Sequence, residues 1–228
     1  PKWTAFLDAH PTPAACADAS LGDVLRLWQG LGYPRRARNL HATATRVTSE
    51  HGGSLPDDLE GLLALPGIGP YTARAVLAFA FERDVAVVDT NIARVLARTV
   101  GERLTPKRVQ AVADQLVPAG EGWLWNQVLM DLGATTCRPT PLCDECPVAT
   151  ACAWRRAGCP EPDPAVGSAG VSVGQAPFEG SDRQARGRLL RSLHDGPRPI
   201  ADVDGRILAS LLADGLVAVG HGRVGLPG

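Results

Sequence analysis

The sequence is short of lysine, of aromatic residues and of net charge, and these shortages limit what the protein can be. Lys2 and Lys107 are its lysines, so arginine carries almost all of the positive charge. With 23 basic and 24 acidic residues the formal net charge is −1, which excludes a protein that coats nucleic acid through overall positive charge. A local basic surface is compatible with this balance. The aromatic residues (five Trp, two Tyr and four Phe) are few enough that their positions carry information.

Long apolar runs are also missing. No run approaches the roughly 20 residues that a membrane-spanning helix needs, and no signal-peptide pattern opens the chain. The 228 residues, 45% of them hydrophobic, suffice for one or two domains, which we expect to lie in the cytoplasm. Because the sequence starts at Pro1 rather than Met, we interpret it as a fragment or processed form whose first residues have no organisation of their own.

A helical pattern runs from Ser20 to about Gly133. Ser20 and Asp23 have the spacing of a capping box, and apolar residues then follow at helical intervals. Further helices are expected over residues 35–50, over 57–65, from Pro70, after Asn91, from 105–106 and around 125–132. Strands do not recur at regular spacing. The sequence therefore predicts an all-α core over residues 1–136.

The composition changes after Cys159. Residues 160–180 are rich in proline and glycine, which predicts a flexible linker. Helical patterns follow at 181–193 and 206–214, and Gly220-His221-Gly222 between two apolar stretches is typical of a hairpin. We therefore expect residues 181–228 to form a small winged-helix-like module, which can bury little surface by itself.

Residues 57–82 contain a helix, a tight turn and a second helix, with the turn at Pro66-Gly67-Ile68-Gly69-Pro70. Gly67 and Gly69 allow a turn in which no Cβ obstructs the backbone. Successive amides and the N-terminus of the next helix could then face a phosphate. An ordinary helix–helix turn is the alternative.

Four of the six cysteines fall close together, as Cys137-x5-Cys143-x2-Cys146-x5-Cys152. Thiolates at this spacing can converge on one metal centre, and soft sulfur ligands select zinc or an iron–sulfur cluster. The spacing leaves zinc and [4Fe–4S] equally open and makes a disulfide pair a minor alternative. We interpret Cys16 and Cys159 as non-ligands.

Together these segments resemble the helix-hairpin-helix, endonuclease III-like superfamily of DNA glycosylases, and within it the MutY-type adenine glycosylases. The resemblance covers residues 1–159 in order. It rests on Leu31-Gly32-Tyr33, Arg35-Arg36-Ala37-Arg38-Asn39-Leu40-His41, the hairpin, Val87-Val88-Asp89-Thr90-Asn91, Asn126-Gln127-Val128-Leu129-Met130-Asp131-Leu132-Gly133-Ala134 and the cysteines. It implies a base-excision-repair enzyme that acts alone on mismatched double-stranded DNA in the bacterial cytoplasm.

The resemblance also implies a cofactor for residues 137–159. In this family the cysteine loop holds a [4Fe–4S] cluster, so Cys137, Cys143, Cys146 and Cys152 are its expected ligands. This chain has five residues between the first two cysteines, where such enzymes usually have six. That difference concerns the geometry of the loop more than the identity of the ligands.

The expected catalytic residues are Asp89, Tyr71 and Asn91. Superfamily members that form a Schiff base carry lysine where this chain has Tyr71, so the resemblance implies a monofunctional glycosylase. Breaking an N-glycosidic bond builds positive charge on the sugar, and by resemblance Asp89 stabilises that charge, assisted by Tyr71 and oriented by Asn91. Alternatively, Asp89 only caps the helix that follows.

Contacts to DNA are expected from Tyr33 as the wedge that enters the base stack, and from Arg35, Arg36, Arg38, Gly67, Gly69 and Arg138 on the backbone. A solvated helix start is the alternative for the arginines. In this family a glutamate on an early helix protonates the departing adenine, and that segment would precede Pro1. The C-terminal module is too short for the Nudix-like domain of many members.

The leading hypothesis is therefore removal of adenine mispaired with 8-oxoguanine or guanine. A thymine or uracil mismatch glycosylase, which shares the tyrosine and aspartate, is one alternative. A catalytically impaired DNA-binding fragment without the general acid is another, and an electron-transfer protein built on the cluster is a third that leaves the hairpin and Asp89 unexplained.

Overall fold

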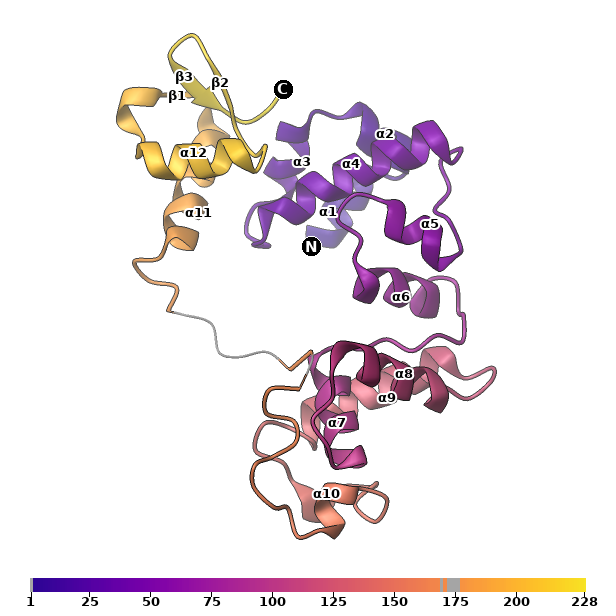
Figure 1. Cartoon of the computed structure of the whole chain (residues 1–228). Coiled ribbons are helices and arrows are strands. Elements are labelled where there is room, and N and C mark those ends of the chain that lie inside the picture. Colours follow the sequence, from indigo (N-terminus) through magenta and orange to yellow (C-terminus); the bar gives the residue numbers. More distant parts are fainter. Residues whose placement is uncertain (1, 169, 172–176) are drawn as a thin grey trace. The chain divides into compact units, whose positions relative to one another are not determined.

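The computed structural model describes residues 2–168, 170–171 and 177–228, and these form two compact units (Figure 1). The first unit consists of residues up to 56, residues 64–67 and the C-terminal residues from 177 onward. The second unit consists of residues 57–63 and the described residues from 68 to 171. No helix in the described ranges is both long enough and apolar enough to cross a membrane.

The first unit contains helices from both ends of the chain and a small sheet. Its elements are α1 (Lys2–Ala9), α2 (Pro13–Asp18), α3 (Leu21–Trp28), α4 (Pro34–Glu50), α11 (Asp182–Ser192), β1 (Arg198–Pro199), α12 (Gly205–Ala213), β2 (Ala218–Gly220) and β3 (Arg223–Gly225). Short 3-10 turns cover Leu193–Asp195 and Ile200–Asp202. The all-α prediction therefore holds, with a sheet confined to the C-terminal module.

The expectation that the first residues have no organisation is wrong, because α1 and α2 lie there. Thr12 caps α2 by accepting a hydrogen bond from the Ala15 amide at 3.1 Å, and Cys16 is buried in the core. Phe6 packs its ring edge against Trp28 of α3. These tertiary contacts stabilise the two helices, which is why no helical periodicity in the sequence indicates them.

The predicted capping box at the start of α3 is confirmed. Ser20 Oγ accepts a hydrogen bond from the Asp23 amide at 3.1 Å and donates one to the Asp23 carboxylate at 2.8 Å. The apolar face that follows is buried, with Val24 and Leu25 almost inaccessible to solvent.

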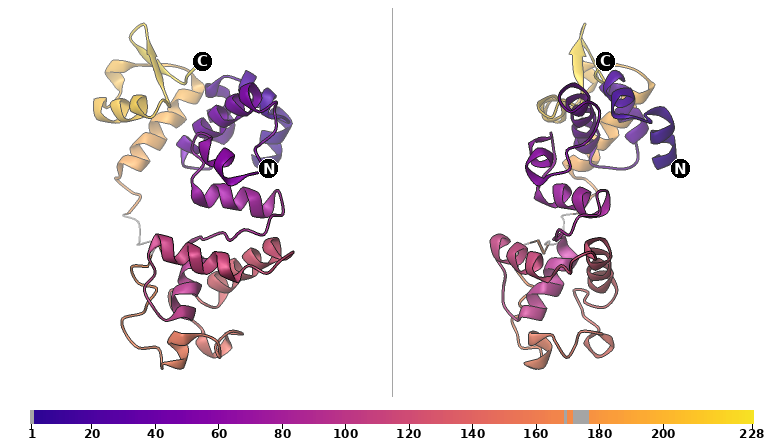
Figure 2. Two further views of the ribbon diagram at one scale, coloured as in Figure 1. Left: turned by 45° about the vertical axis from the view of Figure 1, so that its right-hand side comes forward. Right: turned by 90° about the vertical axis from the view of Figure 1, so that its right-hand side faces the viewer.

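One hydrophobic core joins the N-terminal helices to the C-terminal module, residues 181–228. Val24 and Ala37 share it with Ile207, Leu211 and Leu216, and Figures 1 and 2 show the module beside α3 and α4. The Gly22 amide donates to the Pro227 carbonyl at 2.8 Å. The module therefore completes its core with residues of α3 and α4, which lie far before it in the sequence.

The sheet of the module has the strand order β1-β3-β2, and both pairings are antiparallel. The predicted hairpin joins β2 to β3, with Val219 opposite Val224. His221 and Gly222 at its tip both have positive φ, which matches the right-handed twist of the two strands. With helices α11 and α12 before it, this hairpin gives the winged-helix-like arrangement that the sequence predicts.

The second unit is helical. Its elements are α6 (Pro70–Phe79), α7 (Thr90–Val100), α8 (Pro106–Leu116), α9 (Gly122–Thr135), a 3-10 turn (Cys143–Glu145) and α10 (Ala153–Arg156), and α5 (Leu59–Ala64) precedes α6. Helix α7 is central, since every residue from Ile92 to Arg98 is buried. Ile92 and Leu96 pack with Leu104 and Val109 in the core of this unit.

Composition predicts a flexible linker over residues 160–180, whereas the structure holds part of it against the second unit. Ala165 is buried, Ser168 Oγ accepts from the Leu104 amide at 2.9 Å, and Arg103 Nε donates to the Gly167 carbonyl at 2.7 Å. These partners lie 64 residues apart in sequence, so composition does not reveal them. Residues 169 and 172–176 of the expected linker lie outside the described residues.

Candidate DNA-binding and catalytic site

The predicted turn between α5 and α6 requires glycine at its first glycine position. Gly67 has φ of +73°, and a Cβ there would lie 2.0 Å from Asn39 Nδ2 of α4. Helix α4 also contacts the preceding backbone, where Thr43 Oγ1 donates to the Pro66 carbonyl at 2.9 Å. The start of the hairpin is therefore held against α4.

The second half of the hairpin presents the N-terminus of α6. Gly69 is the N-cap residue and has no side chain to satisfy the first amides of the helix. A Cβ added at Gly69 would meet nothing within 4 Å, so the backbone just before the helix is open on this side. Open amides at a helix N-terminus form an arrangement that binds phosphate.

Tyr71 lies in the first turn of α6 and is half exposed. One turn later, Arg74 Nη1 donates to Asp114 at 2.8 Å and to the Ala86 carbonyl at 3.3 Å. Arg74 thus connects α6 to the extended segment that leads to Asp89. Both expected catalytic side chains, Tyr71 and Asp89, belong to the second unit.

Asp89 is half buried and its carboxylate is held at both oxygens. Oδ1 accepts from the Ile92 amide at 2.7 Å, and Oδ2 accepts from Asn91 Nδ2 at 3.2 Å. Asp89 is thus the N-cap of α7, as the alternative interpretation has it. The same bonds orient the carboxylate while leaving it partly accessible, so capping and catalysis are compatible.

The segment before Asp89 is positioned by one buried amide side chain. Asn126 Oδ1 accepts from the Val87 amide at 2.8 Å, and its Nδ2 donates to the Val85 carbonyl at 2.9 Å. With 1% of its surface exposed, Asn126 substitutes for the strand partner that this extended backbone lacks. Sequence analysis placed Asn126 in a matching motif without assigning it this function.

Arg94 connects Asp89 to the cysteine loop, and sequence analysis missed it. Its Nη2 donates to Asn91 Oδ1 at 2.8 Å, and its Nε donates to the Cys137 carbonyl at 2.7 Å. Burial lowers the pKa of Arg94, and its hydrogen bonds compensate for the desolvated charge. A cation three residues after Asn91 on the same helix was the available signal.

Close packing keeps this connection in place. Gly133 of α9 lies against Asn91, since a Cβ at Gly133 would be 2.6 Å from the Asn91 Cβ. The Gly133 carbonyl accepts from Arg94 Nη2 at 2.6 Å. The orientation of Asn91, and through it that of Asp89, therefore depends on α9 and on the backbone of Cys137.

The four expected metal ligands meet in one pocket. Cys137, Cys143, Cys146 and Cys152 line it together with apolar side chains, among them Val95 and Trp154. Among the residues that the structure describes, no three His, Cys, Asp or Glu side chains form a group that could hold a metal ion. The donor set, four thiols around one pocket, nevertheless fits a metal group that prefers sulfur.

Arg98 is the buried cation beside this pocket, with 2% of its surface exposed. It donates to Cys137 Sγ at 3.4 Å, to the Arg138 carbonyl at 2.7 Å and to Asp163 at 2.6 Å. Burial opposes its charge, but Asp163 and Cys137 together raise the pKa of Arg98. Burial raises the pKa of Cys137, and Arg98 counteracts this by favouring the thiolate.

The two remaining cysteines differ in position. Cys16 is buried in the core of the first unit, away from the loop, as expected of a non-ligand. Burial raises the pKa of the Cys143 thiol, and the neighbouring Cys159 raises it further. The interpretation of Cys159 as a non-ligand stays a prediction.

The expected DNA contacts fall into two groups. Tyr33 is exposed at the N-cap of α4 with φ of +46°, and the Arg36 guanidinium lies 4.9 Å from its ring centre. Arg35 is exposed, whereas Arg38 Nη1 donates to the Asp214 carbonyl at 2.5 Å. These residues belong to the first unit, and the exposed Arg138 belongs to the second.

Known proteins resemble this chain along its length. Adenine DNA glycosylase of Mycobacterium tuberculosis is 44% identical over 99% of this chain and 79% of that protein. Adenine DNA glycosylase of Homo sapiens is 41% identical over 68% of this chain and 30% of that protein. A solved thermostable thymine-DNA glycosylase has a TM-score of 0.65 and 29% identity, covering 68% of this chain and 75% of that one.

The fold is shared more widely. A solved complex of endonuclease III with DNA has a TM-score of 0.60 and 24% identity, and covers 69% of this chain and 75% of that one. The HhH-GPD superfamily of base excision DNA repair proteins matches residues 1–119, which include the hairpin and Asp89. On this match, and on the identity across nearly the whole chain, the protein belongs to the HhH-GPD superfamily of base excision DNA repair proteins.

Proposed function

We propose that this chain is a monofunctional DNA glycosylase that removes adenine mispaired with 8-oxoguanine or guanine by hydrolysing the N-glycosidic bond. The observation that carries the proposal is the 44% identity to an adenine DNA glycosylase over 99% of the chain. The geometry of Asp89 supports it, since a half-buried, oriented carboxylate suits a reaction that builds positive charge on a sugar.

The reaction begins with DNA binding. The open amides at the start of α6 bind a phosphate, and Tyr33 enters the base stack so that the target nucleotide is extruded. The N-glycosidic bond then breaks, its electron pair leaves with the adenine, and the sugar becomes an oxocarbenium-like cation. Asp89 stabilises that cation until water adds to the anomeric carbon, and Asn91 keeps the carboxylate in position.

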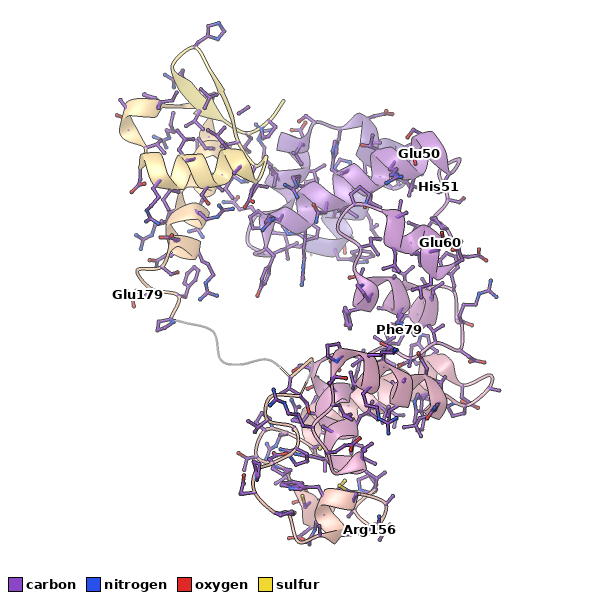
Figure 3. All side chains as sticks on the ribbon, viewed as in Figure 1. Glu50, His51, Glu60, Phe79, Arg156 and Glu179 are labelled. Atoms are coloured by element: carbon purple, nitrogen blue, oxygen red, sulfur yellow. The ribbon has the colours of Figure 1, made fainter. Side chains whose placement is uncertain are left out.

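Tyr71 determines how the reaction ends. A phenol cannot form the Schiff base that a lysine would form with the sugar, so base release leaves the DNA strand uncut. By resemblance the departing adenine is protonated by a glutamate on an early helix. Glu50 and Glu60, labelled in Figure 3, are exposed, and Glu50 pairs with Arg46 at 2.8 Å, so we do not assign this function to them.

We further propose that Cys137, Cys143, Cys146 and Cys152 hold a [4Fe–4S] cluster. Their shared pocket and the buried Arg98 beside Cys137 support this ligand set. When bound, the cluster supplies a covalent link among the four cysteines that fixes the loop against α7. Visible absorbance together with iron and zinc analysis of the purified full chain would distinguish a cluster from a zinc ion.

Mismatched double-stranded DNA is the proposed partner, bound by a monomer in the bacterial cytoplasm. One alternative substrate has its own support, because the thermostable thymine-DNA glycosylase shares the fold at 29% identity. That enzyme's name indicates thymine as the base, so duplexes with T:G and U:G mismatches belong in the same assay.

The test is a single-turnover assay on duplexes that contain A:8-oxoguanine, A:G, T:G or U:G, with the released base detected by chromatography. Adenine release from the first two duplexes alone is the expected result. Asp89→Asn should lower the rate by about 10³-fold while DNA affinity is retained, because a transition-state charge loses its partner. Asp131→Asn is the matched control, since Asp131 is an exposed carboxylate of α9.

Two results would contradict the proposal. Release of thymine or uracil without adenine would identify the alternative substrate. Tight mismatch binding without release of any base would identify a DNA-binding chain.

A further inference from the structure

A groove of about 880 Å³ lies within the first unit, between the loop that joins α3 to α4 and helix α11 of the C-terminal module. One wall includes Trp28, Tyr33 and Arg36, and the other includes Phe178, Arg183 and Arg191. We name it the module groove. It is large enough to hold several units of a polymer. Its walls come from the N-terminal helices and from the C-terminal module of the protein.

The module groove concentrates positive charge in a chain whose net charge is −1. Five arginines and one aspartate line it, namely Arg35, Arg36, Arg183, Arg186, Arg191 and Asp214. Burial, followed by the charge of Arg26, lowers the pKa of His194, so this lining histidine is neutral at pH 7. The surplus of cations favours an anionic ligand over a neutral one, and the volume of about 880 Å³ suits a polymer.

The single carboxylate has a structural function. Asp214 pairs with Arg186 and lies 3.5 Å from Arg35, and its carbonyl accepts from Arg38 at 2.5 Å. These bonds hold the end of α12 to α4. Arg36, Arg183 and Arg191 are exposed side chains of the groove lining.

An aromatic ring accompanies the arginines on each wall. Tyr33 is 61% exposed and Phe178 is 59% exposed, which is unusual for large apolar rings. The guanidinium of Arg36 lies 4.9 Å from the Tyr33 ring centre, and that of Arg183 lies 5.8 Å from the Phe178 ring centre. Exposed rings beside cations are the combination that binds unstacked bases together with their phosphates.

We propose that the module groove binds a DNA strand, so that the C-terminal module forms part of the DNA-binding surface of the enzyme. The arginines of α11 that line the groove contact phosphates, and Phe178 stacks on a base that has left the duplex. The inference rests on the proposed function for the presence of DNA, and extends it by assigning a binding surface to residues 178–191. A protein partner at the same surface is an outcome that the test below separates from DNA.

The test compares two variants of the same helix in the full chain. Arg191 and Arg188 are both exposed arginines of α11, but only Arg191 lines the groove. Affinity for a mismatched duplex is measured by fluorescence anisotropy at several salt concentrations. Arg191→Ala should weaken binding about threefold to tenfold and reduce the slope of log K against log salt by about 0.9, the value for one lost phosphate contact. Arg188→Ala should match the wild type.

A second variant tests the stacking contact. Phe178→Ala should weaken binding about fivefold or more to a duplex with an unstacked base, and should leave the salt slope unchanged because no charge is lost. Phe178→Tyr, which keeps an aromatic ring, should restore affinity. Far-UV circular dichroism of each variant establishes that the first unit stays folded.

Equal affinities and salt slopes for Arg191→Ala and Arg188→Ala would overturn the inference. This outcome is separate from the failure of the proposed function, which is judged by adenine release from the wild type. If the wild type binds DNA with the expected dependence on Arg191 but releases no base, the groove is supported and the activity is not. If Arg191→Ala changes capture of a protein and leaves DNA binding unaltered, the partner is a protein.

Discussion

Buried arginines of the second unit and exposed arginines of the first lie in opposite surroundings. In the second unit, Arg94 and Arg98 are buried on α7, and their hydrogen bonds go to backbone carbonyls, to Asn91 and to Asp163. In the first unit, Arg191 is exposed on α11 and lines a groove. A buried guanidinium whose donors are used within the protein holds the fold, whereas an exposed one such as Arg191 can bind an anionic ligand.

The largest expected effect is on stability, at Arg98. Arg98→Ala leaves the Asp163 carboxylate half buried without its partner, and should destabilise the second unit by about 3–5 kcal/mol, as is typical when one side of a buried ion pair is removed. Denaturant unfolding and the metal content of the purified protein measure this. Arg188→Ala on α11 serves as the control.

The expected result would be contradicted if both arginine variants unfolded at the same denaturant concentration. In that case burial would not separate the two kinds of arginine. Arg98→Lys keeps the positive charge but loses the planar guanidinium that bonds both Asp163 and the Arg138 carbonyl. The difference in unfolding free energy between Arg98→Lys and Arg98→Ala would therefore separate the contribution of charge from that of geometry.

The next effect is on catalysis, at Arg94. Arg94→Gln removes the bond that orients Asn91, and should slow base release about 10²-fold at saturating DNA, since small displacements of a catalytic group cost this much. DNA affinity should stay within twofold of the wild type. Arg94→Lys keeps the charge but cannot bond both Asn91 and the Cys137 carbonyl, so it should restore little activity. A loss of affinity with an unchanged rate would assign Arg94 to DNA binding instead.

The smallest effect concerns acid stability, and again follows from a buried arginine. Burial opposes the charge of Asp163, but its bond to Arg98 outweighs this and lowers the pKa of Asp163. A carboxyl whose pKa is lower when folded stabilises the fold above its unfolded pKa of about 4. That contribution is lost as the pH falls through the folded value.

Asp163→Asn should therefore reduce stability at pH 7 and flatten its dependence on pH below about 4. Asp182 offers a matched comparison, because its pKa is lowered by Arg206 at the surface, where solvent screens the pair. Thermal unfolding of both variants between pH 3 and pH 7 checks this. Equal pH profiles for the two variants would show that burial of the Asp163–Arg98 pair adds nothing to the pH dependence of stability.

Local sequence signals predict most of the helices. The features that the sequence does not indicate depend on tertiary contacts. The capping box at Ser20 and the proline at the start of α6 stand in the sequence itself. Residues 160–171 were interpreted as part of a linker, because Asp163 and Ser168 acquire their partners only when α7 and the segment after it come close.

In the candidate site too, some residues are indicated by local sequence motifs and others only by tertiary contacts. Asp89 and the cysteines lie in motifs, so the sequence identified them without the structure. Arg94 was missed because an arginine on a helix usually marks a solvated face, and here both faces of α7 are covered. The contact of Arg38 with DNA stays a prediction, and the structure adds a bond from Arg38 to the Asp214 carbonyl, 176 residues away, that no local pattern indicates.

The bond between Gly22 and Pro227 has a consequence for synthesis of the protein. As the ribosome makes the chain, α1 to α4 emerge before the second unit, yet the residues that complete their core emerge after it. The second unit can close as soon as residue 171 has been made, while the first must wait until Pro227 has been made. A truncation before Pro227 would therefore disturb helices that were made long before it.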